Sequence, residues 1–177
     1  RTWLAIASIA LVAVLAARIL GPSDTWDQTQ PRTISYTIDV LANGGEHWIL
    51  PREPDGHGAT KPPLYNWLAA PFVAIGGDRS DLAHKMPSVL ALIALWLMIV
   101  VVGNRLDAPR RILGSVAALM LVASYPLFKL GYLARPDMVL VLCLDVGRLL
   151  GTLAVTEASV RRGAAIGFWI AATAAAL

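Results

Sequence analysis

Residues 87–102 read PSVLALIALWLMIVVV, and this stretch decides the fold class because it contains no charged side chain. Similar apolar runs recur along the chain, in which 56% of the 177 residues are hydrophobic and 15% are charged. A soluble domain usually has about 25% charged residues. The composition therefore excludes a disordered chain, a nucleic-acid-binding module and an ordinary cytosolic domain. It predicts an all-α protein that crosses a membrane several times.

Five apolar runs predict membrane-spanning helices. They cover residues 3–20, 87–102, 112–128, 138–156 and 164–177. The first would be about 27 Å long as a helix, which is just enough to cross the hydrocarbon core. A cleaved signal peptide is the alternative for this run, but more spans follow and no clear small-residue cleavage site does. We expect residues 1–177 to be the N-terminal part of a larger protein, because the last run is cut short.

Arginines in two short loops predict the orientation in the membrane. The loops between the second and third runs and between the fourth and fifth contain Arg105, Arg110, Arg111, Arg161 and Arg162. The positive-inside rule places these loops and the N-terminus in the cytoplasm. The long segment 21–86, with eight acids against five bases, then lies outside. We expect a multi-pass protein of the inner cell membrane.

The first half of this outer segment predicts a helix that lies along the membrane surface. Pro31 suits the first position of a helix, and Asn43-Gly44-Gly45 suits its end. Between them, Ile34, Ile38 and Leu41 fall on one helical face. An amphipathic helix next to a membrane usually lies in the interface.

The second half predicts another interfacial helix over residues 64–75, followed by Gly76-Gly77. This stretch is apolar but too short to span a membrane. Tyr65 and Trp67 would lie at the level of the lipid headgroups. Two interfacial helices favour a site that acts on a membrane-embedded substrate.

Lys61 lies in the sharpest local motif, Thr60-Lys61-Pro62-Pro63-Leu64. Pro62 favours an extended backbone at Lys61, and Pro63 stiffens the segment that follows. A cation on a rigid stem at the membrane surface suits a phosphate ligand. A lysine that snorkels to the lipid headgroups fits the same residues equally well.

Acidic residues at both predicted outer loops are the other candidates. Asp24 and Asp27 follow the first span and could act as a general base or as metal ligands, although an acid there is more often a helix cap. Arg135-Pro136-Asp137 lies between the third and fourth spans. Asp137 also suits the first turn of a helix, where the helix dipole favours an acid. The predicted topology puts these residues and Lys61 on one side of the membrane.

The fourth span contains two charged residues, Asp145 and Arg148. Charges inside a membrane suggest a functional site, and a mutually satisfied i,i+3 pair is nearly as plausible. Small-xxx-small patterns at Gly147–Gly151 and Gly163–Gly167 predict close helix packing. The three histidines show no metal-ligand spacing and are interpreted as loop residues; they are His47, His57 and His84.

Several motifs, taken in order, resemble those of a known family. After an acid near the start of the outer loop come His47–Pro51, Thr60–Leu68, Met86–Ser88 and Leu133–Met138. This set resembles the N-terminal region of the ArnT and protein O-mannosyltransferase group. These proteins are C-type glycosyltransferases that use polyprenyl-phosphate sugars. The resemblance covers roughly residues 1–150, and it makes residues 1–177 the first part of such a membrane domain.

The resemblance implies roles for four residues. Asp27 matches the catalytic acid, and Lys61 matches the lysine that contacts the donor phosphate. Asp137 matches a supporting acid in the next outer loop. Arg135, beside Asp137, is expected to bind the donor phosphate together with Lys61. One departure concerns Asp27, which is followed by Gln28 where the family usually has Glu. Asp24 therefore remains a competitor for the catalytic role.

The function implied is transfer of a hexosyl or pentosyl group from a polyprenyl-phosphate donor to a lipid, glycan or protein acceptor on the outer face. The alternatives are a transporter or flippase-like bundle, in which Asp145 and Arg148 would line the pathway, and a non-catalytic scaffold. No cofactor, metal or nucleic-acid partner is predicted, and no residue pattern supports a divalent metal. We expect these 177 residues alone to be inactive, since the donor pocket needs further spans.

Overall fold

The computed structural model describes residues 2–21, 29–108, 110, 112–157, 159 and 161–176. The elements in this part are helices, and the predicted all-α class is confirmed. In chain order they are α1 (Thr2–Leu20), α2 (Thr29–Asn43), the 3-10 helix η1 (Gly45–Trp48), α3 (Leu64–Gly76), α4 (Asp81–Leu106), α5 (Leu113–Ala123), α6 (Tyr125–Leu130), α7 (Asp137–Thr156) and α8 (Arg161–Ala176).

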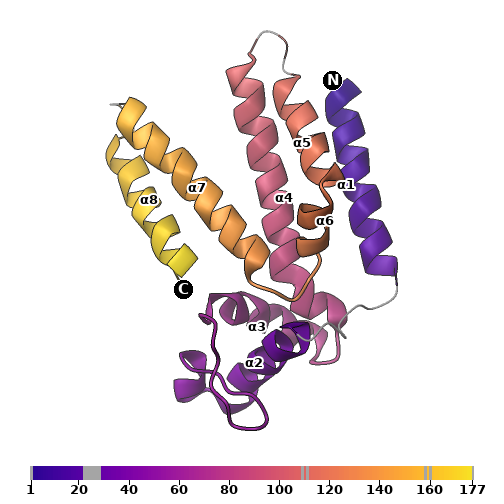
Figure 1. Cartoon of the computed structure of the whole chain (residues 1–177), viewed down its shortest axis with the longest axis vertical. Helices are drawn as coiled ribbons and strands as arrows, with labels where there is room; N and C mark the ends of the chain where they lie inside the picture. The colour runs from indigo at the N-terminus through magenta and orange to yellow at the C-terminus, as the bar shows by residue number, and fades with distance from the viewer. Residues whose placement is uncertain are drawn as a thin grey trace.

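The helices form two regions, which we call the bundle and the cap (Figure 1). The bundle consists of α1 and α4 to α8. The cap consists of residues 29–80, with α2 and α3 lying across the ends of the bundle helices, and the turn 131–136. Among the described residues, α1, α4 and α7 are long and apolar enough to cross a membrane.

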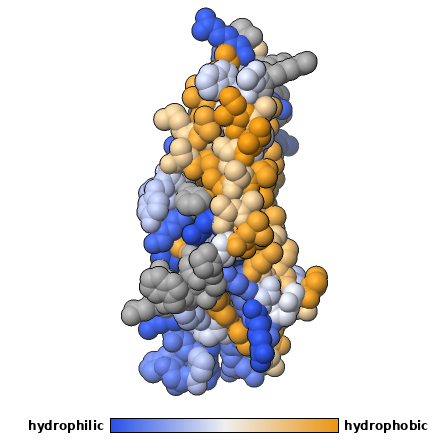
Figure 2. All heavy atoms as spheres, turned by 90° about the vertical axis from the view of Figure 1, so that its right-hand side faces the viewer, coloured by the Kyte–Doolittle hydropathy of each residue, from blue (hydrophilic) through white to orange (hydrophobic). Residues whose placement is uncertain are grey.

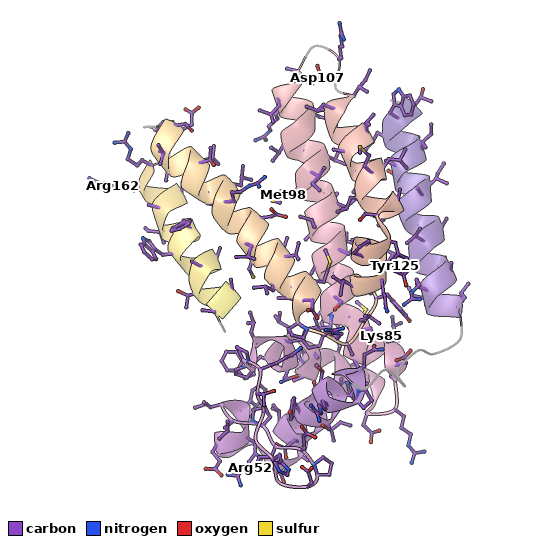
Figure 3. All side chains as sticks on the ribbon, viewed as in Figure 1. Arg52, Lys85, Met98, Asp107, Tyr125 and Arg162 are labelled. Atoms are coloured by element: carbon purple, nitrogen blue, oxygen red, sulfur yellow. The ribbon has the colours of Figure 1, made fainter. Side chains whose placement is uncertain are left out.

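The surface of the bundle supports a membrane location. Figure 2 shows an apolar band between hydrophilic ends on the side where α1 lies. On α1, Ile9 and Val12 are 69% and 65% exposed. Labelled charged residues lie at opposite ends, with Asp107 and Arg162 at one end and Arg52 at the other (Figure 3). Such a band suits contact with lipid.

Helices α4 and α5 pack at backbone distance through two glycines. A Cβ atom on Gly114 would lie 2.4 Å from the carbonyl oxygen of Val100, and one on Gly103 would lie 2.5 Å from the Cα of Gly114. Neither glycine belongs to a pattern that the sequence singled out. Around this contact, α1, α4, α5 and the start of α7 share one apolar core, which includes Leu95 and Met138.

The apolar run at 112–128 forms two helices instead of one. Helix α5 ends at Ala123, Ser124 is extended, and α6 begins at Tyr125. With 11 residues, α5 is about 16 Å long and too short to span a bilayer by itself. The sequence did not predict this break, because residues 112–128 contain no charged side chain.

Helices α7 and α8 form a close antiparallel pair. A Cβ on Gly151 would lie 3.2 Å from Phe168, and one on Gly167 would lie 2.8 Å from Leu150. Close packing at these positions agrees with the small-xxx-small patterns. At Gly163, by contrast, a Cβ would meet nothing within 4 Å.

In the cap, α2 packs on α3 through a polar face. Thr37 is 1% exposed, and its Oγ1 lies 3.3 Å from the Oδ1 of Asn66. Ile38 and Leu41, on the predicted apolar face, are 36% and 39% exposed. The helix starts before Pro31 and ends at Asn43, and the next residue, Gly44, has a φ of +60°.

Helix α3 occupies nearly the predicted residues and ends before Gly77, whose φ is +87°. The prediction that Tyr65 lies at the headgroup level is wrong, because this side chain is 2% exposed. It faces α4 and the turn 131–136, where its hydroxyl forms hydrogen bonds. Tyr65 therefore belongs to the contact between cap and bundle.

Candidate functional site

The turn 131–136 is held in place by hydroxyl groups from two helices. Ser88 on α4 donates a hydrogen bond to the Leu133 carbonyl at 2.6 Å, and its Oγ lies 3.2 Å from the Arg135 carbonyl oxygen. Tyr65 on α3 donates to the His84 carbonyl at 2.8 Å. Burial raises the pKa of Tyr65 well above its ordinary value, so the hydroxyl stays protonated and remains a donor.

This turn presents an ion pair at the start of α7. The Nε of Arg135 lies 2.9 Å from the Oδ2 of Asp137, and the two side chains are 25% and 35% exposed. Asp137 is the first residue of α7, where the helix dipole also stabilises a carboxylate. The ion pair thus fixes the orientation of the Asp137 carboxylate.

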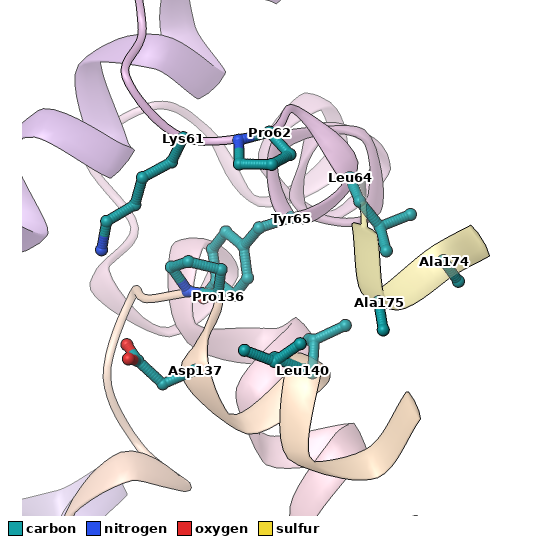
Figure 4. A pocket seen from close by; sticks show the side chains of 10 residues that line it. Lys61, Pro62, Leu64, Tyr65, Pro136, Asp137, Leu140, Ala174 and Ala175 are labelled. Atoms are coloured by element: carbon teal, nitrogen blue, oxygen red, sulfur yellow. The ribbon is translucent and has the colours of Figure 1, made fainter. Parts of the chain in front are cut away.

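Lys61 lies across a small pocket from this turn (Figure 4). The pocket has a volume of about 250 Å³. Lys61 and Asp137 form its polar part, and the wall is completed by Pro62, Leu64, Tyr65, Pro136, Val139, Leu140, Ala174 and Ala175. Lys61 itself is exposed. The pocket therefore joins a cation and a carboxylate to an apolar wall where the cap meets α7 and α8.

Among the described residues, Lys61 has no ion-pair partner. Its exposed side chain lies at the edge of the pocket. An exposed lysine over an apolar wall can bind the phosphate of a lipid, or it can snorkel to headgroups. Its position in a pocket with Asp137 favours the first interpretation.

Asp24 and Asp27 lie outside the described residues. The prediction for Asp27 as the catalytic acid remains a prediction.

The charged pair of the fourth span lies apart from this site. Asp145 and Arg148 are both on α7, and neither lines the pocket. No ion pair joins the two side chains. The alternative of a mutually satisfied pair is therefore not seen in this structure.

The histidines are not all loop residues. His84 lies inside α4 and is 2% exposed, so that interpretation is wrong for it. His47 is in η1, with its Nδ1 2.7 Å from the Oδ2 of Asp39. Within the described ranges, no group of three or more His, Cys, Asp or Glu side chains is arranged to hold a metal ion.

Lys85 lies just before the predicted span 87–102 and is not among the candidate site residues named above. Its side chain is fully buried, 2.9 Å from the Oδ2 of Asp81, and lies over the Tyr132 ring with 4.6 Å from Nζ to the ring centre (Figure 3). The i,i+4 spacing of Asp81 and Lys85 could have indicated the ion pair. The contact with Tyr132 joins α4 to the turn 131–136.

Comparison of the sequence with known protein families gives a match. The profile of the dolichyl-phosphate-mannose-protein mannosyltransferase family matches residues 60–175, which is more than half of the chain. The chain belongs to this family. The match covers Lys61, Arg135 and Asp137, and it begins after Asp27. No curated protein and no solved structure shows significant similarity to the chain.

Family membership makes the chain a membrane protein of a glycosyltransferase family. The sequence predicted this broad class. It gives no separate support to a resemblance with ArnT. Ser88 belongs to the Met86–Ser88 motif, but the sequence did not predict its hydrogen bond to the turn 131–136. Its hydrogen bonds depend on tertiary contacts, which short motifs do not encode.

Proposed function

We propose that the chain transfers a sugar from a polyprenyl-phosphate donor to an acceptor at the outer face of the membrane. One observation carries this proposal. Lys61 and Asp137 line a single pocket whose remaining wall is mainly apolar, at the junction of cap and bundle. A lipid phosphate needs a cation for its head and an apolar surface for its chain, and this pocket supplies both.

The chemistry assigns a role to Lys61. An acceptor hydroxyl or amine attacks the anomeric carbon of the sugar, and the bond from that carbon to the phosphate oxygen breaks. Polyprenyl phosphate leaves with the bonding electrons, and the acceptor proton passes to a base. Lys61 binds the donor phosphate and stabilises the charge that develops on the leaving group.

The carboxylates divide the remaining work. We propose Asp27 as the general base, following the family resemblance, with Asp24 as its competitor. Asp137 supports the site through its ion pair with Arg135, at 2.9 Å. Arg135 in turn places a second cation near the phosphate.

The finer assignments extend the same proposal. The transferred group is a hexose or a pentose, and the acceptor is a lipid, a glycan or a protein hydroxyl. The protein is a multi-pass protein of the inner cell membrane, with its N-terminus in the cytoplasm and residues 21–86 outside. The arginines of the two short loops, at residues 105–111 and 161–162, support this orientation.

The test uses the complete gene in its host. Membrane lipids from wild type, Lys61→Ala and Asp27→Asn are profiled by mass spectrometry for polyprenyl-phosphate sugars. We expect a glycosylated lipid phosphate to accumulate in both variants, because the donor is no longer consumed. Accumulation in Lys61→Ala alone would move the base to Asp24 or Asp137. No change in either variant would contradict the proposal.

A further inference from the structure

Gln30 forms a long-range contact that the proposed chemistry does not yet use. It is the second residue of α2, and its side chain is 0% exposed. The Oε1 of Gln30 accepts a hydrogen bond of 3.0 Å from the backbone N–H of Ala134, which lies 104 residues later. One buried amide thus ties the start of α2 to the turn 131–136.

The turn needs this acceptor. Ala134 is 0% exposed, so its N–H has no access to water. A buried donor left without a partner is unfavourable, and the turn can avoid this state only by moving. The next residue is Arg135, whose own N–H donates to the Leu133 carbonyl at 2.8 Å. A displacement at Ala134 is therefore passed directly to Arg135.

Gln30 bonds to a different kind of backbone group in the turn than Ser88 and Tyr65 do. Ser88 and Tyr65 approach the carbonyl oxygens of the turn from α4 and α3. Gln30 approaches an N–H from α2. Lys61 lies before α3 and takes part in none of these bonds, so a change at Gln30 acts first on the turn rather than on the cation.

We infer that Gln30 is a positioning residue, which sets the Arg135–Asp137 ion pair at the reaction distance from the donor phosphate. This inference rests on the proposed function. It adds that α2 orients the site through one hydrogen bond, besides packing on α3. A 1 Å displacement of a positioned group can cost a rate of about 100-fold.

Three variants of the complete protein separate positioning from folding. Gln30→Met keeps the length of the side chain but removes the acceptor, whereas Gln30→Glu keeps an acceptor oxygen at the same reach. Thr37→Val is the matched control, because it removes another buried hydrogen-bonding group of α2 that does not contact the turn. Each variant is purified, and kcat and KM are measured with a polyprenyl-phosphate sugar donor. Hydrogen exchange of residues 131–136 is measured in the same samples.

We expect Gln30→Met to lower kcat by about tenfold to 100-fold with KM for the donor unchanged within about twofold. Hydrogen exchange of residues 131–136 becomes faster in this variant. In Gln30→Glu, kcat and the exchange rate of the turn return most of the way to the wild-type values. Thr37→Val keeps wild-type kcat and wild-type exchange in the turn.

Other results overturn the inference in distinguishable ways. If wild type is active and Gln30→Met has the same kcat, Gln30 has no positioning role. If Gln30→Met, Gln30→Glu and Thr37→Val lose activity and thermal stability together, the role of Gln30 is structural only. If wild-type protein transfers no sugar from any polyprenyl-phosphate donor tested, the proposed function itself fails, and the positioning role fails with it.

Discussion

The two parts of α7 differ in what surrounds their charges. At the end that meets the cap, Asp137 is ion-paired with Arg135 and borders the pocket. Further along the same helix, in the bundle, Asp145 and Arg148 form no ion pair with each other. Where cap and bundle meet, ion pairs and hydrogen bonds join α4 and α7 to the turn 131–136, whereas the rest of the bundle is held by apolar surface and close glycine contacts. The proposed chemistry belongs to this junction.

The first prediction sets these two acids against each other. Asp137→Asn removes the charge that Arg135 pairs with, and we expect it to lower sugar transfer about tenfold or more. Asp145→Asn makes the same chemical change, carboxylate to amide, on the same helix. It should leave the rate of sugar transfer within about twofold of wild type. Both are measured as initial rates in membranes with equal amounts of protein. The reverse order of effects would favour the transporter alternative, with Asp145 in the pathway.

The second prediction concerns the packing of the bundle. Gly114→Ala places a Cβ 2.4 Å from a backbone oxygen of α4, so the helices must separate. Overpacking of this kind typically costs about 1–3 kcal/mol. Gly163→Ala is the control, because a Cβ there meets nothing and alanine favours a helix. Thermal unfolding of the complete protein in detergent should show a lower midpoint for Gly114→Ala only. Equal midpoints for the two variants would show that α4 and α5 are not in backbone contact.

The third prediction is a small local effect of pH in the cap. Burial alone would raise the pKa of Asp39, but hydrogen bonds from the Arg52 N–H, His47 and Asn43 outweigh it and hold the pKa below its ordinary value of 3.8. A depressed pKa contributes stability that is present above the ordinary value and is lost as the pH falls through the folded value. We expect the Arg52 amide to lose exchange protection below about pH 4, while α7 and α8 keep theirs.

Asp39→Asn is the control for this effect. The variant cannot ionise at this position, so protection of Arg52 should no longer change in that pH range. Protection in wild type that stays constant from about pH 5 to pH 2 would contradict the assignment of the Asp39 hydrogen bonds.

The sequence predicted the parts of the molecule that depend on local pattern. Hydropathy predicted the all-α class, and proline and glycine signals predicted the end of α2 and both ends of α3 closely. The motifs at Lys61 and Asp137 predicted that these residues would share one side of the membrane, and the structure brings them to one pocket. Their chemical roles remain predictions, as does that of Asp27.

The remaining features depend on partners far along the chain. Gln30 bonds to a residue 104 positions away, and Ser88 to one 45 positions away, so neither could be singled out by spacing. Gly103 and Gly114 meet each other across two helices, and neither belongs to a Gly-xxx-Gly pattern within its own helix. Tyr65 was misplaced because an aromatic residue near a membrane has the same local pattern in the interface and in a buried contact.

Binding of the donor lipid tests the central claim most directly. The complete protein is purified as wild type, Lys61→Ala and Arg79→Ala, the last being an exposed cap cation that does not line the pocket. Affinity for a short-chain polyprenyl monophosphate is then measured by equilibrium binding in detergent. We predict that Lys61→Ala weakens binding about tenfold or more and that Arg79→Ala does not change it, since a charge-assisted phosphate contact is lost only in the first. Equal affinity in all three proteins would contradict the claim that this pocket binds the lipid phosphate through Lys61.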